Sequence, residues 1–257
     1  MARQRRERSK SGIYHIMLRG IDKRNIFLDD EDREKFLYTL LKAKQSGGFS
    51  LYAYCLMDNH VHLLIKENEV IGNSIKRITV SYVQWHNNKY GRSGHLFENR
   101  YKSEVVESDN YLLKVARYIH QNPVKANIIK SPSVYIWSSY NKYIDKFYGD
   151  NVQLDTDNIL NYFNNIEKFE EYMMKSNADE CLEYYNKTKL TDNELREQLE
   201  LKYDIEDINN ISKSNRDMMI FQIRKETGAS IRQLSRVLEL GRGIIENATK
   251  NRIIKKD

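Results

Sequence analysis

Hydrophobic and polar residues in the first part of the chain follow strand and helix periods in turn. Residues 12–20 alternate between apolar and mixed positions, which predicts a strand. Residues 29–48 begin with acidic side chains, continue with an apolar stripe and end with lysines and two glycines, which predicts a helix whose charges suit its dipole. Residues 49–57 and 60–67 are apolar runs separated by an Asp-Asn turn signal, and they predict a hairpin.

Three further elements are predicted before residue 150. Residues 72–91 carry apolar positions at helical spacing, and residues 95–108 are typical of one strand or a pair of short ones. Residues 109–123 predict a helix that Pro123 ends. The order strand, helix, hairpin, helix, strand, helix predicts an α+β fold, in which a mostly antiparallel sheet carries its helices on one face.

The composition changes near residue 150, where we expect a domain boundary. Residues 155–210 are rich in Asn, Glu and Tyr and favour helices without strands. Further on, Ser230 followed by Gln233 is a capping signal, and two apolar stripes flank a turn that contains Gly241, as in a helix-turn-helix. The predicted parts are a basic flexible arm (1–11), an α+β domain (12–148), an acidic helical segment (149–212) and a helix-turn-helix-like DNA-binding segment (213–257).

Charge is distributed unevenly along the 257 residues. The net charge of +6 divides into +10 for residues 1–148, −10 for residues 149–212 and +6 for residues 213–257. Basic regions on both sides of an acidic spacer indicate two parts that face nucleic acid. The alternative is that these charges are ordinary solvated surfaces.

The sequence gives no sign of secretion or of a membrane segment. Its two cysteines, Cys55 and Cys181, are too few for a disulfide framework, and we expect free thiols in a reducing compartment. The basic N-terminus is not followed by the apolar stretch of a signal peptide, and no run approaches the roughly 20 apolar residues of a membrane span. We therefore expect a cytoplasmic protein.

Two histidines, His60 and His62, interrupt an apolar strand. Residues i and i+2 of a strand point to the same face, so the two imidazoles can converge on one ion. Imidazole is a common metal ligand, although two separately hydrogen-bonded structural histidines are the alternative. The cysteines are not placed to complete a closed site, so we expect an open site with an added oxygen ligand, which suits chemistry on phosphate.

The helix predicted over residues 109–123 places Tyr118 and Asn122 on one face, because they are four residues apart. A tyrosine can act as a nucleophile, and an asparagine offers a carbonyl oxygen to a metal. The chain has 18 tyrosines, so packing alone is the alternative for Tyr118.

Four motifs occur in order along the chain: "NHVHLLI", "GRSGHLFENRYKS", "YLLKVARYIHQNPVKANI" and "WSSY". Together they resemble the REP-associated tyrosine transposases, which belong to the HUH single-strand transposase superfamily and carry an IS200-like transposase domain. The resemblance covers roughly residues 10–145. It implies a ferredoxin-like domain, whereas the acidic segment and the C-terminal helices lie outside it.

The resemblance also implies residue roles. His60 and His62 would bind Mg²⁺ or Mn²⁺, Asn122 would complete the metal site, and Tyr118 would be the nucleophile. The implied reaction is metal-dependent cleavage and rejoining of single-stranded DNA through a 5′-phosphotyrosine, at palindromic or hairpin repeats. The resemblance leaves open whether the protein is a monomer or a homodimer.

Five basic residues are candidate DNA contacts. Arg100 and Lys102 lie on the strand predicted within residues 95–108, and Arg232, Arg236 and Arg242 lie in the predicted helix-turn-helix. Two other functions remain open: a catalytically inactive DNA-binding regulator that acts through the helix-turn-helix, and a metal nuclease that uses water in place of Tyr118.

Overall fold

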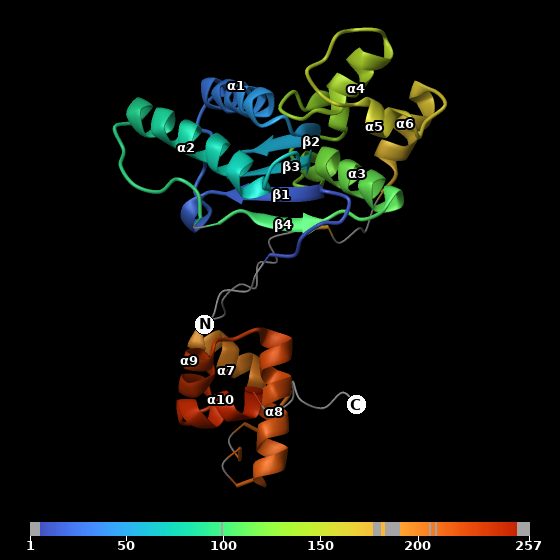
Figure 1. Cartoon of the computed structure of the whole chain (residues 1–257). Coiled ribbons are helices and arrows are strands. Elements are labelled where there is room, and N and C mark those ends of the chain that lie inside the picture. The colour runs from blue at the N-terminus through green and yellow to red at the C-terminus, as the bar shows by residue number, and fades with distance from the viewer. Residues whose placement is uncertain are drawn as a thin grey trace. The chain divides into compact units, whose positions relative to one another are not determined.

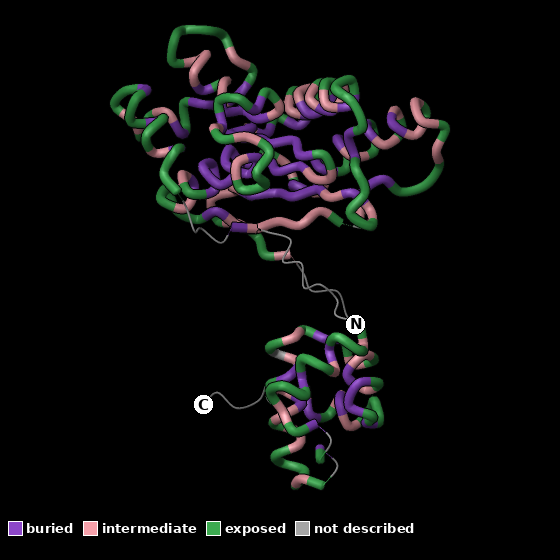
Figure 2. Tube along the Cα trace, turned by 180° about the vertical axis from the view of Figure 1, so that it is seen from behind, coloured by how far each residue is buried: buried purple, intermediate pink, exposed green. Residues whose placement is uncertain are grey.

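The computed structural model divides the chain into two compact units, Met1–Glu183 and Tyr184–Asp257. It describes residues 6–98, 100–176, 181–182, 191–205, 207–208 and 210–250. Each unit has its own buried core, visible as two separate sets of buried positions (Figure 2).

The N-terminal unit is built on a four-stranded antiparallel sheet (Figure 1). Helix α1 connects β1 to β2, a hairpin connects β2 to β3, and α2 connects β3 to β4. This βαββαβ order, with strand order β2-β3-β1-β4, is the ferredoxin-like arrangement, as predicted. The bounds are β1 Ile13–Arg19, α1 Asp30–Gly47, β2 Ser50–Met57, β3 His60–Lys66, α2 Ile71–Lys89 and β4 Lys102–Val105.

Helices cover both faces of this sheet. The prediction that they lie on one face is therefore wrong once the helix after β4 is included. Leu18 of β1 lines a cavity together with residues of α2, which places α2 on the Leu18 face. Helix α3 (Asp109–Lys125) brings the ring of Tyr118 to 5.6 Å from that of His62, on the opposite face. Helix α3, which follows β4, therefore forms a layer on the other face of the sheet (Figure 1). The order of elements alone did not predict which face this helix covers.

Two predicted element boundaries differ from the structure. Within 95–108 only β4 is a strand, and Phe97 forms an isolated bridge with Gly20. Pro123 does not end α3 but lies inside its last turn. Its missing N–H costs only the bond to the carbonyl of Ile119, and the helix continues for two residues.

The predicted basic arm is partly attached to the domain. Residues 1–5 lie outside the described part of the chain. The Arg6 guanidinium lies 3.7 Å from the centre of the Tyr101 ring and donates a hydrogen bond to the Tyr101 carbonyl. The backbone N–H groups of Lys10 and Ser11 donate to the Glu107 carboxylate. Residues 6–11 therefore lie along the domain.

The division between the units does not coincide with the change of composition near residue 150. Helices of the acidic segment pack on the N-terminal unit: the ring of Phe169 stacks on that of Tyr143 with centroids 5.1 Å apart. The Gln121 side chain of α3 also donates to the carbonyl of Met173 at 2.6 Å. Helices α5 Asp157–Leu160 and α6 Ile166–Met174 lie in the acidic segment, α4 Tyr140–Phe147 precedes it, and short 3₁₀ turns occur at Ile21–Lys23 and Pro132–Val134.

The C-terminal unit contains four helices in its described part, α7 Asp192–Glu200, α8 Lys213–Thr227, α9 Ile231–Val237 and α10 Arg242–Lys250. The Ser230 hydroxyl accepts a hydrogen bond from the Gln233 N–H, so the predicted cap of α9 is present. Two short helices therefore follow each other across a turn that contains Gly241, and Leu234 and Ile245 bury their side chains in the core of this unit.

Both cysteines, Cys55 and Cys181, are buried, and neither forms a disulfide. Within the described ranges, the helices are too short or too polar to cross a membrane.

Candidate active site

One face of the sheet carries the candidate residues of β3. In the antiparallel register, Arg19 of β1 is opposite His60 and Met17 is opposite His62. Because opposite residues point to the same side, Arg19, His60 and His62 share the face that α3 covers. The predicted side-by-side placement of the histidines is present, with their ring centroids 5.0 Å apart.

The imidazole of His60 is held by its neighbour in the hairpin. His60 Nδ1 lies 2.6 Å from Asn59 Oδ1, and the Asn59 amide nitrogen donates to the carbonyl of Lys23. Since the Asn59 oxygen can only accept, His60 Nδ1 carries the proton. The lone pair of His60 is therefore on Nε2.

His62 is buried at the centre of the sheet, and its Nδ1 lies 2.9 Å from Nε2 of His15 on β1. Burial lowers the pKa of His60 to about 4 and that of His62 well below its ordinary value. Both imidazoles are consequently neutral at pH 7, the form in which histidine binds a metal.

Helix α3 places its two candidate residues against this pair. The Tyr118 ring meets the His62 ring edge-on, and the Asn122 side chain lies beside the His60 imidazole. The Asn122 amide nitrogen donates one of its two hydrogens to the Tyr118 carbonyl at 3.1 Å, which orients the side chain relative to the helix. The structure thus brings together all four residues singled out from the sequence.

This donor set suits an open metal site. Nowhere in the described ranges do three His, Cys, Asp or Glu side chains form a group that could hold a metal ion, so the third protein ligand near the histidines would be the Asn122 amide oxygen. Two imidazoles and one amide leave coordination positions for phosphate oxygens. The Lys125 ammonium lies 4.4 Å from the centre of the Tyr118 ring and adds positive charge beside it.

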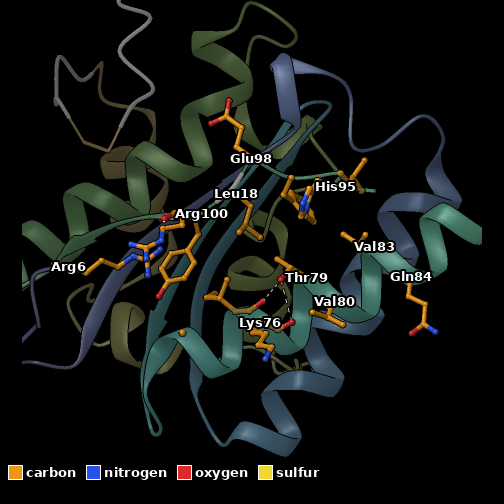
Figure 3. A pocket seen from close by; sticks show the side chains of 15 residues that line it. Arg6, Leu18, Lys76, Thr79, Val80, Val83, Gln84, His95, Glu98 and Arg100 are labelled. Atoms are coloured by element: carbon orange, nitrogen blue, oxygen red, sulfur yellow. Dashed lines mark hydrogen bonds between the residues drawn. The ribbon is translucent and has the colours of Figure 1, made fainter. Parts of the chain in front are cut away.

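The two basic residues predicted near β4 lie in different surroundings. Lys102 is opposite Met17 in the register and so lies on the α3 face, where burial lowers its pKa. Arg100 lines a cavity of about 600 Å³ with Arg6 and residues of α2 (Figure 3). Leu18 also lines this cavity, which therefore belongs to the opposite face of the sheet from the histidines.

The basic residues predicted in the C-terminal unit are all exposed. Arg236 is paired with Asp192, its Nη2 lying 3.0 Å from the carboxylate. Arg242 is the first residue of α10, and Arg232 lies in the first turn of α9.

Sequence reasoning missed four polar residues around the site: His15, Arg19, Glu104 and Lys125. His15 sits in an apolar alternation like that of His60 and His62, but its strand has no second histidine two residues away. Its place beside His62 depends on which strands are neighbours, and the local pattern does not contain that information.

Three comparisons with known proteins agree with this geometry. Residues 8–122 match the model of the family described as "Transposase IS200 like", and this range includes all four clustered residues. This part of the N-terminal unit is therefore similar to the IS200-like transposases. A Haemophilus influenzae protein whose name assigns it to the REP-associated tyrosine transposases is 24% identical over 155 residues, which are 55% of this chain and 87% of the relative.

The N-terminal unit also has a structural counterpart. A solved structure of a REP-associated tyrosine transposase bound to a REP hairpin superimposes with a TM-score of 0.50 at 17% identity, covering 57% of this chain and 87% of the other. That likeness shows a common fold. The resemblance to REP-associated tyrosine transposases is thereby confirmed for the N-terminal unit.

Proposed function

We propose that this protein is a metal-dependent single-stranded DNA transposase or endonuclease that acts on hairpin repeats through Tyr118. The observation that carries the proposal is the meeting of the Tyr118 ring with His62 while Asn122 contacts His60 on the same sheet face. The family match and the hairpin-bound structural relative support the class of substrate.

In the proposed reaction, Tyr118 Oη attacks the scissile phosphorus. A bond forms between Oη and phosphorus, the bond from phosphorus to the 3′ oxygen breaks, and the tyrosine proton leaves so that the departing oxygen becomes a 3′-OH. The product is a 5′-phosphotyrosine on the protein. Attack by another 3′-OH reverses these changes and rejoins DNA without ATP.

The remaining residues of the site orient the phosphate. His60, His62 and Asn122 would hold Mg²⁺ or Mn²⁺, which supplies Lewis-acid charge stabilisation when bound. Arg19, Lys102 and Lys125 place positive charge on the same side of the sheet or beside Tyr118, where a DNA backbone would pass.

The C-terminal unit is proposed to bind duplex DNA. Its α9 and α10 have the length and order of a helix-turn-helix, and Arg232 and Arg242 are exposed on them. This unit would add affinity for DNA near the hairpin. If the protein is instead a catalytically inactive regulator, the C-terminal unit would carry the function by binding DNA.

A gel experiment tests the proposal. Labelled single-stranded hairpins, pooled from repeats of the source genome, are mixed with the full chain and Mn²⁺ and separated under denaturing conditions. The proposal predicts an adduct that Tyr118→Phe and EDTA abolish and that Tyr38→Phe, which removes an exposed hydroxyl on α1, retains. Cleavage without an adduct, unchanged in Tyr118→Phe, would establish a water-using nuclease, and binding without cleavage would establish the regulator.

A further inference from the structure

A line of three polar side chains crosses the sheet behind the candidate metal site. His15 on β1 is directly opposite Glu104 on β4 and diagonal to His62 on β3. His15 Nε2 lies 2.9 Å from His62 Nδ1, and His15 Nδ1 lies 3.5 Å from the Glu104 carboxylate. His15 and His62 are fully buried, so water does not compete for these contacts.

The directions of the protons along this line follow from the chemistry of its ends. The negative charge of the Glu104 carboxylate faces His15 Nδ1 at 3.5 Å, which favours the proton of His15 on that nitrogen. His15 Nε2 then carries a lone pair and accepts the Nδ1 proton of His62. The lone pair of His62 is therefore on Nε2. The lone pair of His60 is also on Nε2, because Asn59 accepts the proton of His60 Nδ1.

The Glu104 carboxylate is itself held in place. The backbone N–H of Leu182 donates to Glu104 Oε2 at 3.0 Å, and the Tyr111 hydroxyl of α3 is hydrogen-bonded to the same side chain. At 3.5 Å the contact between Glu104 and His15 Nδ1 is longer than an ordinary hydrogen bond, and His15 Nδ1 makes no hydrogen bond to another described group. The carboxylate whose charge faces His15 is therefore held in place by its own partners.

We infer that His15 and Glu104 are positioning residues that set the tautomer and orientation of His62 and raise the basicity of its Nε2 for a metal ion. This inference rests on the proposed function, in which His62 is a metal ligand. Outer partners of this kind commonly change metal affinity by about 10- to 100-fold, because a misoriented or wrongly protonated imidazole cannot bind.

Two substitutions at one position separate positioning from simple packing. His15→Gln keeps an amide oxygen that can accept from His62 Nδ1, whereas His15→Leu is of similar size and offers no acceptor. Glu104→Leu removes the carboxylate and leaves His15 itself intact. The chain has only six histidines, so their ¹⁵N signals can be assigned by substitution in the metal-free full chain.

Side-chain ¹⁵N NMR and Mn²⁺ binding test the inference. We expect His62 to carry its proton on Nδ1 in the wild type and in His15→Gln, and to lose that single tautomer in His15→Leu and Glu104→Leu. Mn²⁺ should bind these two about 10- to 100-fold more weakly, with an unchanged His120 signal showing that the fold is retained.

A proton on Nε2 of wild-type His62, or a tautomer and Mn²⁺ affinity unchanged in His15→Leu, would overturn the inference. Loss of the His120 signal in His15→Leu would leave Glu104→Leu and His15→Gln to decide by the same two measurements. The tautomer needs neither DNA nor Tyr118. A wild type with the expected tautomer and no DNA adduct would therefore contradict the proposed function alone.

Discussion

The Asn122 amide nitrogen donates a hydrogen bond to the carbonyl of Tyr118, one helical turn earlier on α3. This bond ties the candidate nucleophile to the candidate third ligand, because it directs the Asn122 amide oxygen away from the helix backbone. The same side chain lies beside the His60 imidazole. One helix thus delivers both groups to the histidine pair, at a spacing of four residues.

Asn122→Asp and Asn122→Leu should differ in metal affinity. Both lose the amide N–H that bonds the Tyr118 carbonyl, but only Asp keeps an oxygen ligand. We expect Asn122→Asp to bind Mn²⁺ at least as well as the wild type and Asn122→Leu to bind it about 10- to 100-fold more weakly. Electron paramagnetic resonance of free Mn²⁺ measures both. If Asn122→Leu binds Mn²⁺ with wild-type affinity, Asn122 is not a metal ligand.

Lys102→Ala should weaken binding of single-stranded hairpin DNA and change its salt dependence. Lys102 lies on the α3 face, and the loss of one phosphate contact should reduce the slope of log K against log salt by about 0.7. Fluorescence anisotropy over a series of salt concentrations gives the slope. Lys42→Ala, an exposed lysine on α1, is the control, and equal slopes in both variants would argue against this contact.

Stability of the N-terminal unit should fall with acidity because of His120. Burial lowers its pKa to about 3 in the folded state, whereas an unfolded histidine titrates near 6.5. The contribution is therefore complete above about pH 6.5 and is lost as the pH falls towards 3. Between pH 7.5 and 5.5 the wild type should lose about 1.4 kcal/mol from this residue.

Urea unfolding followed by tryptophan fluorescence measures this loss in the right unit, because both tryptophans, Trp85 and Trp137, lie in the N-terminal one. His120→Gln should show a smaller loss of stability between the two pH values than the wild type. His95→Gln, which changes an exposed histidine, should keep the wild-type difference. An identical pH dependence in all three proteins would contradict the assignment to His120.

Arg242→Ala should weaken binding of duplex DNA. The residue begins α10 and is exposed, the position from which a recognition helix contacts DNA. We expect an affinity at least about fivefold lower in anisotropy measurements, with hairpin cleavage chemistry unchanged. Lys213→Ala, at the start of α8, is the matched control. Equal affinities in the two variants and the wild type would indicate that this unit has another role.

Local periodicity was sufficient to predict the parts of the site that lie within one element. The strand period puts His60 and His62 on one face, and the helix period puts Tyr118 next to Asn122. The same reasoning could not find Glu104 and His15, because their place behind His62 depends on the pairing of β1 with both β3 and β4.

Local sequence patterns also could not predict where the chain divides into its two compact units. The composition changes near residue 150, yet Phe169 stacks on Tyr143 and keeps the following helices in the N-terminal unit. Packing between elements, which composition does not record, decides where a compact unit ends. Which face α3 covers depends on the same kind of contact, namely that of Tyr118 with His62.

The central claim is that Tyr118 forms the covalent bond to DNA, and mass spectrometry of the adduct tests it most directly. After reaction with a cleavable hairpin, nuclease treatment and trypsin digestion, Tyr118 lies in the peptide of residues 118–125, between Arg117 and the site after Lys125. The account predicts a 5′-linked nucleotide on the tyrosine of this peptide. A nucleotide attached to any other residue, or DNA cleaved while this peptide stays unmodified, would contradict it.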